Sequence, residues 1–149
     1  MVNRYLGFQA KIVPQHEGLI DKFVGDEMVA LFIGERALER AIDCAIAIQR
    51  RIRREHETDP LPIHIGIGIN YGPVILGNMG AEKRLDYTVI GSAVNLGARL
   101  CLEAKGGEIL IRRELLESLG MDVDILSTAM MAFKGVSTEL EIAAISSTE

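Results

Sequence analysis

The stretch that most constrains the fold is residues 18–33, which reads GLIDKFVGDEMVALFI. Two mainly apolar runs, 19–24 and 28–33, flank a Gly25-Asp26 step. Gly and Asp in a two-residue connection between apolar runs are a strong β-hairpin signal, so we predict a hairpin here. The second run is almost continuously apolar, which predicts a strand buried on both faces.

Asp26 would lie at the tip of this hairpin, and it has two interpretations. Asp is common in turns because its side chain hydrogen-bonds to nearby backbone groups, so it could be a turn former only. A carboxylate held on a rigid hairpin tip could instead face a cation. Taken alone, the residue favours the turn former, because hairpin tips rarely carry chemistry.

Composition narrows the class of protein. The 149 residues fit one domain, and 48% hydrophobic with 25% charged residues is typical of an ordered globular chain. The net charge of −5 argues against a nucleic-acid partner, which would require a basic patch. We see no apolar run of the ~20 residues that span a bilayer and no signal-peptide pattern, which predicts no membrane contact and a cytoplasmic location. Cys44 and Cys101 are expected to be buried, reduced thiols.

The rest of the chain alternates helical and strand patterns. Residues 1–16, 35–55, 92–105 and 112–119 are predicted helices, and 63–70, 88–91, 108–111 and a terminal hairpin of 124–134 with 140–145 are predicted strands. Gly66 and Gly68 are unusual in a strand and indicate close approach of another backbone, a helix or a ligand. Asn95 and Arg99 lie four residues apart, so they project from one helix face. The pattern indicates an α+β fold.

Two blocks carry a family resemblance: DKFVGDEMVALF and GIGINYGPVILGNMGAEKRLDYTVIGSAVNLGARL. In order and context they resemble the catalytic domain of class III adenylyl and guanylyl cyclases, and the resemblance covers about residues 5–145. It implies a ferredoxin-like βαββαβ domain with an antiparallel-rich sheet and a C-terminal β-hairpin. The resemblance also makes it less favoured that Asp26 only forms a turn.

One part of the family pattern has no counterpart here. The family domain begins with a strand that carries the first of two metal-binding aspartates, in a pattern similar to Phe-x-Asp-x-x-Gly-Phe. We therefore expect residues 1–149 to form a single nucleotidyl cyclase domain that is truncated at its N-terminus. The missing strand would lie between the strands at 28–33 and 63–70, so its absence is expected to leave two unpaired edges. Ser92 departs from the Asp or Asn common in the family, which we expect to affect helix capping more than chemistry.

The resemblance implies conversion of ATP to 3′,5′-cyclic AMP and pyrophosphate, assisted by two divalent cations, Mg²⁺ or Mn²⁺. Asp26 matches the second metal-binding aspartate. Lys22 matches the lysine that reads the purine, and Thr88 stands where the partner of that lysine, often an aspartate, would be. A lysine with Asp or Thr is similar to the pair that selects adenine, whereas guanine selection in the family usually has Glu and Cys. The remaining matches are Asn95 for the ribose, Arg99 for charge on the α-phosphate, and Lys83 and Lys134 near phosphate-binding positions.

Several alternatives stay open at this stage. Lys22 could be an exposed strand-end charge, Thr88 an ordinary strand residue, and Asn95 with Arg99 a hydrogen-bonding pair on a helix. The family pairs two domains head to tail, so a homodimer is implied, with an upstream sensor or regulatory domain. We expect little or no cyclase activity from the truncated chain. The alternatives are a non-catalytic cyclase homology module for dimerisation or nucleotide-dependent regulation, and an unrelated ferredoxin-like enzyme or binding domain.

Overall fold

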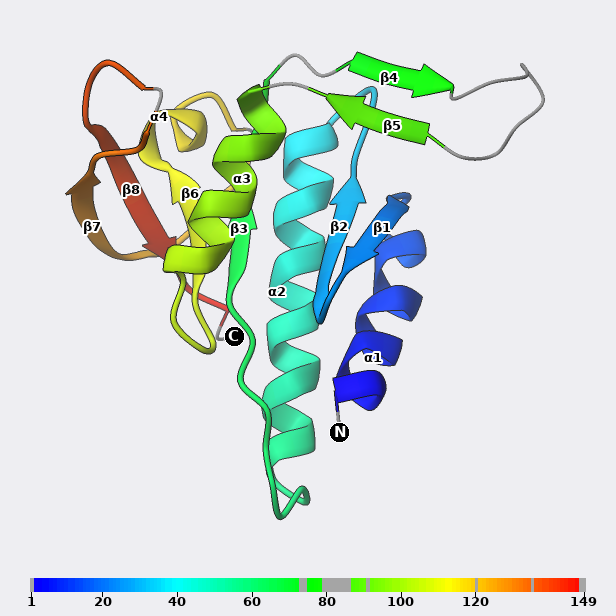
Figure 1. Ribbon diagram of the computed structural model, residues 1–149. Coiled ribbons are helices and arrows are strands. Elements are labelled where there is room, and N and C mark those ends of the chain that lie inside the picture. Colours follow the sequence, from blue (N-terminus) through cyan, green and yellow to red (C-terminus); the bar gives the residue numbers. More distant parts are fainter. Residues whose placement is uncertain are drawn as a thin grey trace.

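The computed structural model describes residues 2–72, 75–78, 87–90, 92–119, 121–134 and 136–147 (Figure 1). The elements follow in the order α1 (Val2–Gln15), β1 (Leu19–Val24), β2 (Glu27–Leu31), α2 (Ala37–His56), β3 (Ile67–Ile69), β4 (Ile75–Asn78), β5 (Tyr87–Ile90), α3 (Ser92–Glu103), β6 (Ile109–Arg112), α4 (Arg113–Leu116), β7 (Ile125–Met131) and β8 (Leu140–Ile145). The predicted α+β content is confirmed. In the described part, no helix is both long and apolar enough to cross a bilayer.

The predicted hairpin is confirmed as β1 and β2. The two strands pair antiparallel, with Val24 opposite Glu27 and the two-residue Gly25-Asp26 loop between them. Gly25 has a φ of 62°, which is the conformation that the first loop position of a primed hairpin turn requires. The expectation that the second strand is buried on both faces is wrong, because every residue of β2 is only partly buried.

Helix α2 is the long central element of the molecule (Figure 1). Its predicted apolar stripe is buried, with Ile42 and Ile52 at 0% and 2% exposure. One part of this stripe packs against the hairpin and α1, and another part packs against β6 and β8. The Arg40 guanidinium donates hydrogen bonds to the carbonyls of Glu17 and Ile33, so both ends of the hairpin are tied to α2.

A four-stranded sheet has the order β3-β6-β8-β7. β3 runs parallel to β6, and β8 is antiparallel to both β6 and β7, so the predicted C-terminal hairpin is confirmed. Ile109, Ile111 and Ala143 are fully buried in the core between this sheet and α2. The predicted strand at 63–70 is shorter than expected, since only Ile67–Ile69 pairs.

Helix α3 lies directly on β3, as the glycines of that strand indicate. A Cβ atom on Gly66 would meet the Ala104 carbonyl oxygen at 2.6 Å, and one on Gly68 would meet the Cys101 nitrogen at 2.4 Å. Of the three possibilities that the sequence left open, the neighbour is therefore a helix backbone. This contact fixes the position of α3 and of the side chains on its outer face.

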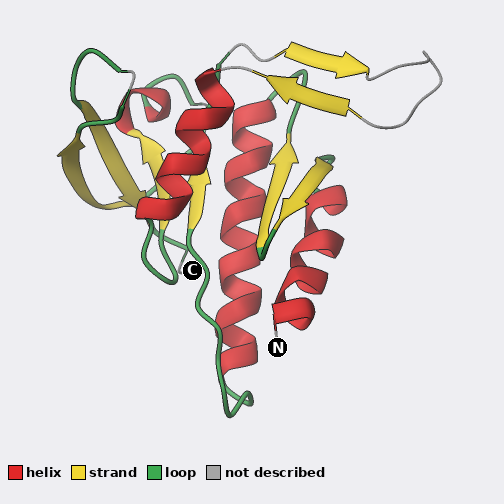
Figure 2. Cartoon of the chain, viewed as in Figure 1, coloured by secondary structure: helices red, strands yellow, loops and turns green. Residues whose placement is uncertain are grey.

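The strands of the described residues form three separate sheets (Figure 2). β1 and β2 pair only with each other, and so do β4 and β5. β2 is therefore not joined to β3, although both pack toward α2 (Figure 1). In the described part of the chain, β2 and β3 each have one edge that pairs with no other strand, as expected.

Candidate active site

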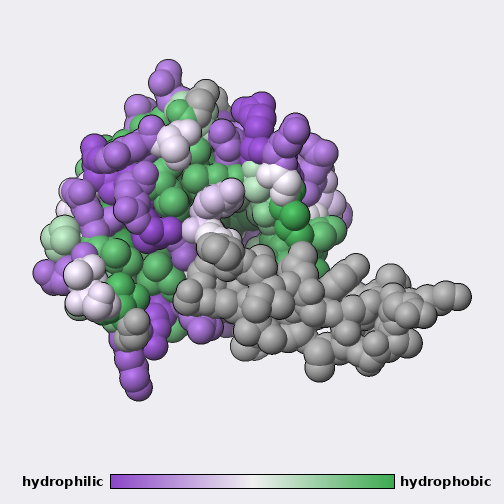
Figure 3. Space-filling view, turned by 90° about the horizontal axis from the view of Figure 1, so that it is seen from above, coloured by the Kyte–Doolittle hydropathy of each residue, from purple (hydrophilic) through white to green (hydrophobic). Residues whose placement is uncertain are grey.

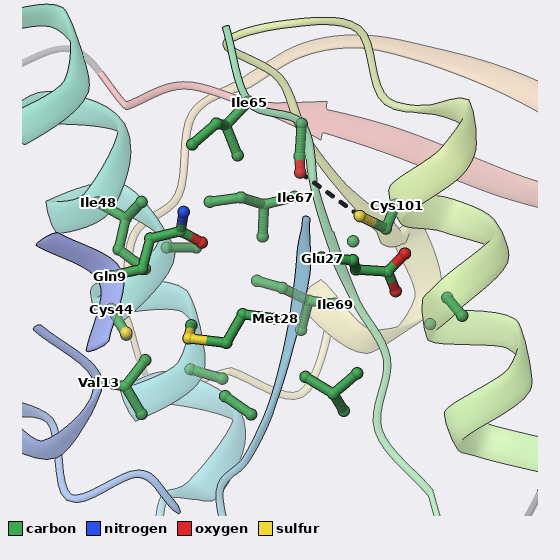
Figure 4. Close-up of a pocket in the computed structure, with 18 of the residues that line it drawn as sticks. Gln9, Val13, Glu27, Met28, Cys44, Ile48, Ile65, Ile67, Ile69 and Cys101 are labelled. Carbon is green, nitrogen blue, oxygen red and sulfur yellow. Dashed lines mark hydrogen bonds between the residues drawn. The ribbon is translucent and has the colours of Figure 1, made fainter. Parts of the chain in front are cut away.

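The space between β2 and β3 is a slot of about 470 Å³. Its lining is largely apolar and comes from five elements: Met28 and its neighbours on β2, Ile65–Ile69 around β3, and residues of α1, α2 and α3 (Figure 4). Seen from above, the molecule has a hollow near the middle of the view, with hydrophobic residues along part of its rim (Figure 3). A slot between two unpaired strand edges presents main-chain N–H and C=O groups, which an extended segment can pair with.

Asp26 and Glu27 lie at one mouth of this slot. Asp26 is exposed at the hairpin tip, and Glu27 is partly buried at the start of β2. Next to Glu27 lies the Cys101 thiol of α3, which donates a weak hydrogen bond to the Gly66 carbonyl at 3.5 Å (Figure 4). Burial raises the pKa of Cys101, and the negative charges of Glu27 and Asp26 raise it further. The charges at the hairpin tip are therefore close enough to α3 to act on its Cys101 thiol.

The outer face of α3 carries the two predicted catalytic side chains. Asn95 and Arg99 are both exposed, one helical turn apart, and Arg99 is two residues from Cys101. In the described part of the chain, neither side chain has a hydrogen bond or ion pair. The interpretation as a pair that hydrogen-bonds along the helix is therefore wrong in this structure, and both side chains are available to a ligand.

Lys22 lies on β1, with 49% of its side chain exposed and its ammonium 3.8 Å from an Asp21 oxygen. Lys134 is exposed in the connection after β7. Thr88 pairs with Gly77 through the backbone of β5, and its side chain lies outside the described residues, as does all of Lys83. No hydrogen bond or ion pair links any two of the predicted site residues that the structure describes.

The described residues do not form a complete site for a divalent cation. No group of three or more His, Cys, Asp or Glu side chains is placed among them to hold one. Mg²⁺ and Mn²⁺ prefer an octahedron of oxygen ligands, and two such ions side by side need a carboxylate that both can share. Asp26 supplies one carboxylate, so the metal set expected from the sequence is incomplete within these residues.

Three residues near the site were not predicted: Asp21, Glu27 and Cys101. Glu27 and Cys101 come together only because the hairpin tip lies next to α3, and no spacing in the sequence indicates that approach. Asp21 is the residue at which the β1–β2 register shifts, since Ile20 lies opposite Ala30 but Lys22 lies opposite Val29. A bulge of this kind is set by packing and leaves no clear trace in the local sequence.

Comparison with known proteins decides the family. Residues 12–144 match the sequence model of a protein family, the adenylate and guanylate cyclase catalytic domain. The chain belongs to this cyclase family. The resemblance drawn from the two motif blocks is thereby confirmed.

Solved structures of cyclases match nearly the whole chain. The guanylyl cyclase Cya2 has a TM-score of 0.86 and 34% identity, with 97% of this chain and 77% of that chain covered. The adenylyl cyclase CyaB from P. aeruginosa has a TM-score of 0.76 and 32% identity, with 99% and 81% covered. Since one of these proteins is a guanylyl cyclase and the other an adenylyl cyclase, the similarity alone does not select the purine.

The curated relatives are longer proteins from mycobacteria. The uncharacterized proteins Rv1319c and Rv1320c of Mycobacterium tuberculosis are each 39% identical over 105 residues, which is 70% of this cyclase chain. The match covers 20% and 18% of their lengths, so the chain spans about a fifth of each of these relatives.

Proposed function

We propose that this chain forms part of an adenylyl cyclase site that converts ATP to 3′,5′-cyclic AMP and pyrophosphate in signal transduction. One observation carries the proposal: the Asn95 and Arg99 side chains are exposed on one face of α3 and have no partner of their own among the described residues, so both are available to a ligand. Family membership supplies the reaction class. An unpaired guanidinium and an unpaired amide on one helix face suit a phosphorylated ligand.

In the reaction, the ribose 3′-oxygen attacks the α-phosphorus of the nucleotide. A new P–O bond closes the ring, the bond from the α-phosphorus to the bridging oxygen breaks, and pyrophosphate leaves while the 3′-hydroxyl proton passes to solvent. Negative charge builds on the α-phosphate oxygens as this happens. Arg99 would stabilise that charge, and its loss would lower the rate by ~100-fold or more, as for other preorganised donors. Asn95 would orient the ribose, while Lys83 and Lys134 would bind phosphate.

Selection of adenine rests on Lys22 and Thr88. Lysine donates to the ring nitrogen N1, which is an acceptor in adenine, and threonine accepts from the 6-amino group. In guanine, N1 carries a proton and position 6 is a carbonyl, so the same pair would face the wrong partners. A site that hydrogen-bonds one base in this way discriminates against the other, because the wrong base leaves the polar groups of the site unpaired.

We also propose that an extended segment occupies the slot and completes a ferredoxin-like βαββαβ sheet. The two unpaired edges on β2 and β3 and the apolar lining support this. Such a strand would lie beside Asp26, so a carboxylate on it would give the divalent cations, Mg²⁺ or Mn²⁺, the second acidic ligand that the described residues lack.

A homodimer would complete the site from two chains. In a head-to-tail pair, Asp26 of one chain would face Lys22, Thr88, Asn95 and Arg99 of the other, and twofold symmetry would give two equivalent sites. Because the chain spans about a fifth of its mycobacterial relatives, we further propose that a sensor or regulatory domain accompanies it in a longer protein.

Nucleotide binding tests the proposal. In calorimetry with non-hydrolysable analogues and Mg²⁺, we expect the ATP analogue to bind at least about 10-fold more tightly than the GTP analogue, which is ~1.4 kcal/mol. Lys22→Ala should remove most of this preference, and Lys11→Ala, which changes an exposed lysine of α1, should not. Equal binding of both analogues, or a preference for GTP, would contradict adenine selection.

A second candidate is a non-catalytic cyclase homology module that dimerises or regulates a partner through nucleotide binding. The incomplete metal set among the described residues favours it. The two candidates differ in their response to a completed slot: the enzyme would turn over once a strand with a carboxylate is present, whereas the module would bind nucleotide without turnover.

A further inference from the structure

Asp21 is an unusual buried carboxylate. Only 2% of its side chain is exposed, and its Oδ2 atom is buried without a hydrogen-bond partner among the described residues. A buried carboxylate without partners is costly, by several kcal/mol in general, and such groups are usually hydrogen-bonded or paired with a cation. The cation beside it is the Lys22 ammonium, 3.8 Å from Oδ2.

A bulge in β1 makes this pairing possible. Adjacent residues of a regular strand point to opposite faces, so the charged groups of residues 21 and 22 would normally be far apart. The register shift between Ile20 and Lys22 makes Asp21 the extra residue of the strand. Bulges often re-aim a side chain beside a functional site, and here the result is a carboxylate next to the ammonium of the adjacent residue.

The two side chains differ sharply in exposure. Lys22 is 49% exposed and Asp21 only 2%, so the carboxylate lies beneath the ammonium and the ammonium faces outward. At 3.8 Å the pair is an ion pair and too long for a hydrogen bond, so the ammonium protons remain free to bind a ligand. A lysine side chain has four flexible carbons, and holding its end in one place before binding lowers the entropy cost of recognition.

We infer that Asp21 is a positioning residue, which holds the Lys22 ammonium toward the base of a purine nucleotide. This inference rests on the proposed function, because it needs Lys22 to contact the base. Asp21 itself does not touch the nucleotide. The variant Asp21→Asn keeps the size of the side chain and removes its charge, so it should free Lys22 without leaving a cavity.

A double-mutant cycle tests the inference, with the non-hydrolysable ATP analogue as the probe. We expect Asp21→Asn to weaken binding by about 10-fold in the natural sequence and to have almost no effect in a Lys22→Ala background. A role in folding alone would cost the same in both backgrounds. Asp43→Asn, at an exposed aspartate of α2, is the matched control and should leave binding unchanged.

A second measurement reads the pair directly and does not need nucleotide. In protein labelled with ¹⁵N- and ¹³C-lysine, the side-chain signals of Lys22 should shift in Asp21→Asn and stay in place in Asp43→Asn, with Lys22→Arg giving the assignment. Unshifted Lys22 signals, or an equal loss of ATP binding in both backgrounds, would overturn the positioning role while leaving the proposed function intact. If the unaltered chain binds neither the ATP nor the GTP analogue, the positioning role of Asp21 and the proposed function are both contradicted.

Discussion

The main-chain nitrogen of Cys101 lies 2.4 Å from the point that a Cβ atom on Gly68 would occupy. Gly68 is in the middle of β3 and Cys101 is in α3, so helix and strand are as close as their backbones allow. The same helix carries Asn95 and Arg99, and their position therefore depends on a glycine that is far from them in the sequence.

We predict that Gly68→Ala destabilises the protein, because its methyl group would clash with the Cys101 nitrogen and the Gly97 carbonyl, which are backbone atoms. Overpacking of this kind costs about 3 kcal/mol. Gly7→Ala is the control: no atom lies within 4 Å of the added methyl group, and alanine favours a helix by up to about 1 kcal/mol. Chemical denaturation should show opposite signs for the two variants, and equal stabilities would contradict the close packing of α3 on β3.

The Cys101 thiol should ionise less readily than a free cysteine. Its pKa is raised by burial first and then by the charges of Glu27 and Asp26, so alkylation should become fast only at a higher pH than in a model peptide. Burial raises the pKa of Cys44 to about 12, so Cys44 should react after Cys101. Mass spectrometry of iodoacetamide-treated protein at increasing pH measures both.

Charge removal supplies the control for that experiment. Glu27→Gln should move the reaction profile of Cys101 to lower pH, whereas Glu35→Gln, at an exposed residue after the hairpin, should leave it unchanged. An unchanged profile in Glu27→Gln would mean that the hairpin tip and α3 do not share the mouth of the slot.

The Tyr5 hydroxyl donates a 2.6 Å hydrogen bond to Asp59, which joins α1 to the turn after α2. This bond and a second one from the Leu61 amide lower the pKa of Asp59. A carboxylate with a lowered pKa contributes stability above its unfolded pKa of about 3.9, and that contribution is lost as the pH falls through the folded pKa. Tyr5→Phe should therefore bring acid unfolding to a higher pH.

Circular dichroism between pH 6 and about pH 2 would follow this unfolding. Tyr71→Phe is the matched control, because Tyr71 is 54% exposed and its side chain takes part in no hydrogen bond among the described residues. If both variants unfold at the same pH, the Tyr5–Asp59 bond contributes nothing to the docking of α1.

Much of the fold follows from local patterns. The Gly25-Asp26 loop between apolar runs predicts the hairpin, and the spacing from Leu38 to Ile52 predicts the buried stripe of α2. Gly66 and Gly68 predict a close neighbour, and it is a helix. These features were predictable because each depends on residues that are near one another in the chain.

Other features depend on contacts between distant segments. The apolar run of β2 predicts burial on both faces, but β2 faces the slot and every residue stays partly exposed. The bulge at Asp21 and the approach of Glu27 to Cys101 follow from how the hairpin lies on α2 and α3, which local patterns do not record. The roles of the predicted site residues stay predictions, although Asp26, Asn95 and Arg99 are all exposed, as a binding role requires.

We expect that a strand with a carboxylate must fill the slot before the site can turn over ATP. Cyclic AMP formation with Mn²⁺ and ATP tests it on three proteins: the chain alone, the chain with an extended apolar segment carrying one Asp fused ahead of α1, and the same fusion with that Asp replaced by Asn. We predict product from the Asp fusion and at least ~100-fold less from the other two. Turnover by the chain alone that equals turnover by the Asp fusion would show that the site needs no strand in the slot.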